Sequence, residues 1–223
     1  MTIRGEDLLL SGAWILAVGA LIDAIGQTRQ SLTHSDLGKD LIIEGNGIEA
    51  FGNSLQAIGR TKLLKSEREL AQIYTIFGAW LEAAGNSTNA VGISIELNGA
   101  EEEGTKIDAL GSGVQGLGAA FEALGASMDE DSSYRALAIT GNSLISLGSF
   151  LAAIGNIYDL NEKSVIGEQF LLVSSWIVVI GAFILIHAIT LEVEHIEQEK
   201  HEENPKHGNG NSYPYSYNNY SYT

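Results

Sequence analysis

Glycine recurs at every seventh residue along most of this chain, and this spacing limits the fold more than any other feature. Gly5, Gly12, Gly19 and Gly26 form one run, and further runs start at positions 38, 71, 104, 134 and 167. Glycine occupies 20 of the 24 positions in six runs of four. The starts are 33 residues apart, except for one interval of 30. The chain therefore consists of six copies of one unit.

The residues between the glycines follow a helical pattern. A heptad reads Gly-x-x-apolar-x-x-apolar, as in Gly45 followed by Ile48 and Phe51. Residues three and four apart share one face of an α-helix, and the period-two alternation of strands is absent. Flexible glycine-rich linkers do not place apolar residues in a fixed phase. The pattern therefore predicts six helices, over residues 5–29, 36–60, 67–97, 101–126, 133–157 and 163–203.

Long helices joined by short connectors favour antiparallel neighbours. We therefore expect an all-α fold, a six-helix up-and-down antiparallel bundle built from 33-residue repeats of one helix each. A helix-turn-helix solenoid of the ankyrin type also has a period of 33, but it requires a turn inside each unit. The expected organisation is five repeats over 1–162, a last repeat over 163–203 and a disordered tail over 204–223.

Glycine inside a helix costs about 1 kcal/mol relative to alanine, so the glycine rows need a compensating gain. Close approach of two helix backbones supplies one, because it increases dispersion contact. A sustained seven-residue repeat also predicts left-handed supercoiling. The glycines expected to mediate helix packing are Gly12, Gly19, Gly45, Gly52, Gly78, Gly85, Gly111, Gly118, Gly141, Gly148 and Gly181.

The position four residues after each glycine separates the middle repeats from the end repeats. We expect the polar residues there to face solvent and the apolar stripe to form the core. The first and last repeats instead place apolar residues at this position, including Leu9, Leu16, Leu171, Val178 and Leu185. The polar set of the middle repeats is Glu49, Gln56, Glu82, Asn89, Asp108, Gln115 and Glu122.

The last repeat contains a segment, 170–191, without Asp, Glu, Lys or Arg. At 1.5 Å per residue such a helix is about 33 Å long, which matches a hydrocarbon core of about 30 Å. It is either a transmembrane span, with the lipid bilayer as partner, or a buried central helix. Residues 136–158 and 8–22 are secondary span candidates.

Composition excludes several classes of function. A formal charge of −16 argues against a nucleic-acid partner, because phosphate binding needs clustered Lys and Arg. The chain has no cysteine, which removes disulfides, thiol nucleophiles and cysteine metal sites. The apolar N-terminal stretch resembles a signal peptide in part. The glycine repeat continues through it, however, so we expect it to be the first helix.

No catalytic, cofactor-binding or metal-binding residues stand out, and no small-molecule substrate is indicated. The glycines lie inside helices rather than in a phosphate-binding loop. His195, Glu199 and His201 lack the spacing of a helical metal site and indicate a solvated acidic helix end. Asp23 is a carboxylate on an otherwise apolar helix, and we expect it to be exposed near the helix end.

The tail after Pro205 consists of Gly, Asn, Ser, Tyr, Pro and Thr, with five Tyr between residues 213 and 222. Such a composition cannot form a core. The segment is either a plain soluble tail or a site of weak self-association or tyrosine cross-linking.

The phrases Gly-Ala-Trp-Ile at 12–15 and Gly-Ala-Trp-Leu at 78–81 resemble uncharacterised glycine-heptad repetitive proteins of Bacillus-type bacteria. The resemblance spans roughly residues 5–160 and implies no activity. Three hypotheses follow. The protein is a non-enzymatic, membrane-associated structural or assembly protein, a pore-forming or membrane-permeabilising protein, or a soluble scaffold that forms homo-oligomers.

Overall fold

A computed structural model describes residues 3–33, 35–64, 69–129 and 133–203 of the chain. The predicted tail over 204–223 lies outside the described residues. Six α-helices and one short 3-10 helix make up the described part: α1 (Gly5–Thr33), η1 (Asp36–Gly38), α2 (Lys39–Leu63), α3 (Glu69–Leu97), α4 (Glu101–Met128), α5 (Arg135–Leu160) and α6 (Ser164–Glu203). The all-α prediction is confirmed, and each predicted helix corresponds to an observed one.

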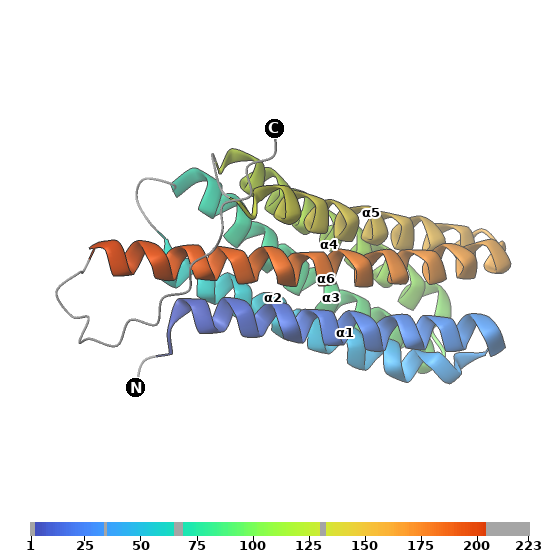
Figure 1. Cartoon of the computed structure of the whole chain (residues 1–223). Coiled ribbons are helices and arrows are strands. Elements are labelled where there is room, and N and C mark those ends of the chain that lie inside the picture. The colour runs from blue at the N-terminus through green and yellow to red at the C-terminus, as the bar shows by residue number, and fades with distance from the viewer. Residues whose placement is uncertain (1–2, 34, 65–68, 130–132, 204–223) are drawn as a thin grey trace.

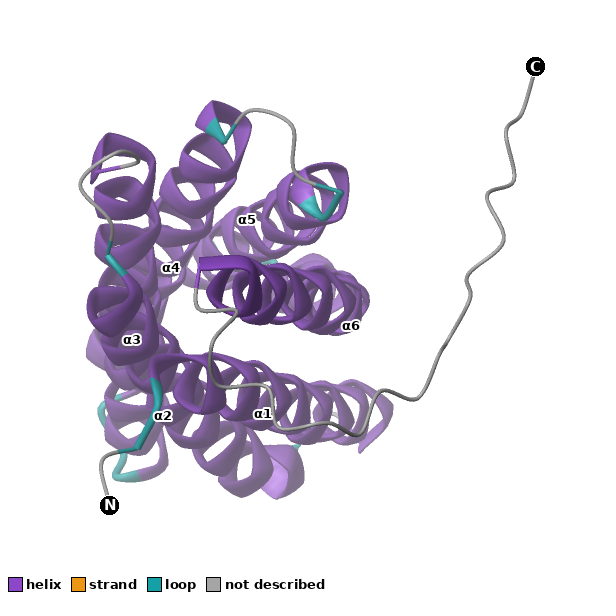
Figure 2. Ribbon diagram, turned by 60° about the vertical axis from the view of Figure 1, so that its left-hand side comes forward, coloured by secondary structure: helices purple, strands orange, loops and turns teal. Residues whose placement is uncertain are grey.

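The helices lie side by side as an up-and-down bundle (Figure 1). Each helix contacts the next one in the chain, and α1 also contacts α6. The order of contacts is thus a closed ring, with α6 placed between α5 and α1 (Figures 1 and 2). The alternative in which residues 170–191 form a buried central helix is wrong, because Val173, Trp176, Ile180 and Phe183 of α6 are exposed.

Glycine rows join the helices in three antiparallel pairs, α1 with α2, α3 with α4, and α5 with α6. A Cβ atom built on Gly12 would lie 2.6 Å from the carbonyl oxygen of Gly52, and one on Gly78 would lie 2.5 Å from that of Gly118. In the third pair, a Cβ on Gly181 would lie 2.7 Å from the carbonyl oxygen of Gly141. Real Cβ atoms do not approach backbone this closely, so these contacts require glycine.

All eleven glycines named from the sequence lie at such helix–helix contacts. Three other helical glycines fall outside the heptad frame: Gly47 and Gly113 have open space around them, and Gly116 faces the Phe150 side chain rather than a backbone. The frame therefore separates glycines that allow close backbone contact from glycines that do not.

The prediction of which helix face is buried was wrong. The polar residues four positions after glycine face the interior: Glu82 and Glu122 are each 1% exposed, and Glu49 is 3% exposed. The apolar residue six positions after glycine points outward, as in Phe51, which is 59% exposed. The reason is geometric, because the residues beside the glycine contact are those one and four positions after it. The buried polar residues at the latter position are Glu49, Gln56, Glu82, Asn89, Asp108, Gln115 and Glu122.

The end helices supply the apolar part of the interior. Leu9 and Leu16 of α1 pack in one cluster with Val178 and Leu185 of α6 and Ile145 of α5. Of the apolar residues that set the first and last repeats apart in the sequence, Leu9, Leu16, Val178 and Leu185 are thus core residues, and Leu171 is half-buried. The interior is mainly apolar where α1, α5 and α6 meet and mainly polar along α2, α3 and α4.

Two alanine substitutions on α4 test the role of the glycine frame. Gly118→Ala should lower the free energy of unfolding by about 1–3 kcal/mol, because its methyl group would overlap the backbone of α3. Gly113→Ala is the matched control and should raise it by up to about 1 kcal/mol, since alanine is the better helix former. Thermal unfolding followed by circular dichroism measures both. Equal effects at the two positions would contradict the packing role.

Candidate functional site

The interior holds a row of five carboxyl side chains along the bundle. Asp23 comes from α1, Glu49 from α2, Glu82 from α3, and Asp108 and Glu122 from α4. We call this set the carboxyl row. Four of its members are buried, and Asp23 is half-buried and lines an inner cavity. The expectation that Asp23 lies exposed near a helix end was therefore wrong, since α1 continues to Thr33.

Amide and hydroxyl groups line the carboxyl row. Asn156 donates to Asp108 at 2.8 Å, and Asn46 donates to Asp23 at 3.2 Å. Gln115 lies 3.5 Å from Glu49 across the ring. These groups come from α2, α4 and α5, so the row is held together only when the ring is formed.

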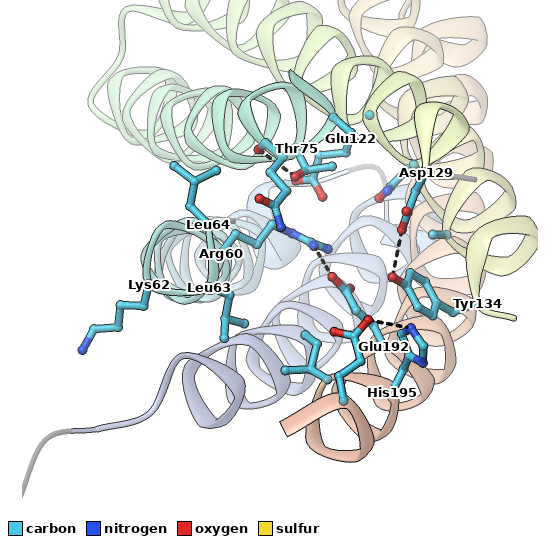
Figure 3. A pocket seen from close by; sticks show the side chains of 18 of the residues that line it. Arg60, Lys62, Leu63, Leu64, Thr75, Glu122, Asp129, Tyr134, Glu192 and His195 are labelled. Atoms are coloured by element: carbon cyan, nitrogen blue, oxygen red, sulfur yellow. Dashed lines mark hydrogen bonds and ion pairs between the residues drawn. The ribbon is translucent and has the colours of Figure 1, made fainter. Parts of the chain in front are cut away.

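One end of the row opens into a cavity of about 270 Å³ that residues of α2, α3, α4, α5 and α6 line (Figure 3). Arg60 projects into it and donates to Glu192 at 2.7 Å. Glu122 lies on the other side of the Arg60 side chain from Glu192 (Figure 3). Tyr134 donates to Asp129 at 2.8 Å on the side of the cavity that faces Arg60 (Figure 3). We call this the Arg60 cavity.

Arg60 is the largely buried cation of this end, with 11% of its side chain exposed. Burial lowers the pKa of its guanidinium, but the charges of Glu192 and Glu122 outweigh that effect and hold the pKa above its ordinary value. Arg60 therefore stays charged and offsets the acidic side chains around it. Sequence reasoning missed this pair, because Arg60 and Glu192 are 132 residues apart and meet only through the contact that closes the ring.

The other end of the row opens into a cavity of about 180 Å³ that Asp108 also lines. Lys39 lies 2.8 Å from Asp36 and 3.1 Å from Glu96 there. Burial lowers the pKa of Lys39, but the two carboxylates reverse the effect and the pKa is raised. Burial also raises the pKa of Glu96, which Lys39 offsets only in part. We call this the Lys39 cavity.

The helix-end histidines form a different arrangement. His195 lies 3.3 Å from Glu199 one turn further along α6, and His201 is exposed. Within the described ranges, no group of three or more His, Asp or Glu side chains converges closely enough to hold a metal ion. The carboxyl row thus differs from a metal centre because its members are spread along the bundle.

The outer surface complements this interior. Helices α1, α5 and α6 are each long and apolar enough to cross a membrane, by length and composition. These include the three segments singled out from the sequence, 8–22, 136–158 and 170–191.

A family model matches residues 7–186 of the chain. The chain belongs to a family of unknown function, DUF6944. The match covers all six helices in whole or in part and extends beyond the 5–160 resemblance into the last repeat. No curated protein and no solved structure matches the chain. Membership of DUF6944 therefore assigns no activity, and the site has to be interpreted from its own geometry.

Substitution of Arg60 tests whether it neutralises the cavity. Arg60→Met leaves Glu192 and Glu122 without their buried cation and should cost about 3–5 kcal/mol of unfolding free energy. Lys106→Met is the control, since Lys106 pairs with Glu102 on the exposed surface and should have no measurable effect. Chemical denaturation of the two variants makes the comparison. If Arg60→Met leaves the free energy of unfolding unchanged, the role given to Arg60 is refuted.

Proposed function

We propose that this protein is an integral membrane protein whose six helices span the bilayer together, with a non-enzymatic role. The main support for this proposal is one segment of each helix that has no exposed charged residue. Together we call these six segments the belt: residues 8–28, 45–59, 70–95, 107–128, 136–158 and 169–191. Within these ranges the carboxyl row supplies every Asp, Glu, Lys and Arg side chain. None of those five is exposed.

The dimensions of the belt fit a bilayer. At 1.5 Å per residue the six ranges are roughly 22 to 39 Å long, which brackets a hydrocarbon core of about 30 Å. The shortest range is in α2, where the following residue, Arg60, points into the cavity. Exposed charges such as Asp7, Lys62, Glu102 and Lys106 lie beyond the belt at the two ends of the bundle.

The ring favours insertion of all six helices over anchoring by α6 alone. Helix α6 contacts both α5 and α1, so a bilayer around α6 also surrounds its neighbours. Helices α2, α3 and α4 are less apolar in composition because they carry the buried polar residues. Their outer faces are apolar, with Phe51, Phe77 and Leu117 exposed. Charged groups in membrane proteins characteristically face the bundle interior in this way.

Two further candidates draw on particular observations. The polar interior supports a permeation role for the membrane-spanning ring, in line with the pore-forming hypothesis. The exposed apolar faces would also suit a soluble scaffold in which copies of the chain cover one another. Substitution of an exposed belt residue by a charged one distinguishes membrane insertion from such self-association.

Membrane insertion is tested by fractionation and by one charge substitution. The protein should stay in the membrane pellet after alkaline carbonate extraction. Leu117→Arg, at an exposed position in the middle of the belt, should reduce the inserted fraction, because arginine at the bilayer centre costs about 2.5–3.5 kcal/mol or more. Leu97→Arg, beyond the belt at the end of α3, is the control and should insert normally.

Recovery of the unmodified protein as a soluble monomer would defeat the proposal. Recovery as a soluble oligomer that Leu117→Arg dissociates would favour the scaffold instead.

A further inference from the structure

The carboxyl row connects the two cavities at opposite ends of the bundle. Asp108 lines the Lys39 cavity, and Glu122 lines the Arg60 cavity. Between them lie Asp23, Glu49 and Glu82. The row therefore runs through the belt, from one group of exposed charges to the other.

The first half of the row runs from Asp108 to Glu49. Asp108 acts electrostatically on Asp23, and Asp23 acts on Glu49 in the same way. All three side chains line one inner cavity of about 40 Å³, together with Gln115 and Ser174. This cavity shares Asp108 with the Lys39 cavity.

The second half runs from Glu49 to the Arg60 cavity. Glu49 acts electrostatically on Glu82, and Asn86, one helical turn from Glu82 on α3, is buried with neither of its side-chain polar atoms hydrogen-bonded. Glu82 and Glu122 lie close enough for their carboxyl groups to interact. A carboxyl–carboxyl hydrogen bond needs one proton, since an ionised carboxylate has no donor. A hydrogen bond between these two groups would therefore hold one proton.

Polar atoms without a protein partner face this half of the row. Among the described residues, Glu82 Oε2, Glu122 Oε2, Asn53 Nδ2 and Asn142 Oδ1 are buried and have no hydrogen-bond partner. Each of these side chains is at least 98% buried. Buried polar atoms are almost always satisfied by protein or by water, so this pattern points to a small hydrogen-bonding ligand between the helices.

The size and chemistry of the row favour protons over other cations. The inner cavity of about 40 Å³ has room for one or a few water molecules and is too small for a hydrated metal cation. The described carboxyl groups do not converge as a metal site does. Proton relays are one of the known roles of Asp, Glu and His chains inside membrane proteins.

We propose that the carboxyl row is a proton pathway that connects the Lys39 cavity to the Arg60 cavity across the bilayer. This inference rests on the proposed membrane insertion. It adds the transported species and the residues that carry it.

Each transfer step is a balanced proton exchange. A carboxylate accepts a proton from a neighbouring donor as that donor's O–H bond breaks, and the resulting carboxyl group passes a proton to the next acceptor. One proton enters at one cavity as one leaves at the other, so the row returns to its starting state. The membrane potential or a pH gradient drives the net movement.

The test uses the full-length protein in liposomes that contain a pH-sensitive dye and potassium. Valinomycin then creates a potential, negative inside, that drives protons inward. The unmodified protein should acidify the lumen faster than empty liposomes. Glu82→Gln and Glu122→Gln should each slow acidification about tenfold or more, since an amide cannot accept and release a proton in this way.

Glu102→Gln is the matched control, because it makes the same change on α4 at an exposed position outside the belt. It should leave the flux unchanged. Asp23→Asn provides a second test within the row if a glutamate variant fails to fold, and it should also slow the flux. Flotation with the liposomes and circular dichroism check insertion and helix content of every variant.

The outcomes separate the two proposals. If the unmodified protein does not float with the liposomes, membrane insertion fails, and the pathway fails with it. If the protein floats and is helical but carries no protons, the pathway alone is refuted. Flux that the substitutions in the row leave unchanged also refutes it, as does faster passage of sodium than of protons.

Discussion

Contact between helix backbones is the constraint on which this structure depends. Because Gly12, Gly52, Gly78 and Gly118 have no side chain, the paired helices approach until backbone carbonyls occupy the space of a Cβ atom. The residues beside each glycine then lie at the inner edge of the contact, and the bulkier residues of the heptad turn outward. The glycine repeat thus fixes which face of every helix is inside. It also explains why each helix keeps one glycine phase along its length.

The sequence was sufficient to predict the helices but not which side of them is buried. Helix number and approximate bounds follow from the periodicity, since each unit maintains one apolar phase between connectors. The burial of Glu49, Glu82 and Glu122 was not expected, because an apolar stripe was assumed to avoid water. Periodicity identifies two faces of a helix, and the surrounding medium determines which of them is buried. One signal was available, because the middle of the helices carries acids but neither Lys nor Arg.

The candidate site was harder to predict than the fold, because its parts come from distant repeats. The Arg60–Glu192 pair joins the second helix to the sixth, and the Asn156–Asp108 contact joins the fifth to the fourth. No local spacing relates these residues. The order of helices around the ring had to be known first. Helix periodicity alone left open whether the sixth helix closes the ring or fills its centre.

The contact between the first and last helices has a consequence for biosynthesis. Helix α1 leaves the ribosome long before α6, and α6 is its partner at the seam. During this interval a row of ionisable groups would be open on one side to whatever surrounds the nascent chain. Completion of the final forty-residue helix therefore marks the moment when the interior is sealed. A chain truncated before α6 would leave that side of the interior uncovered.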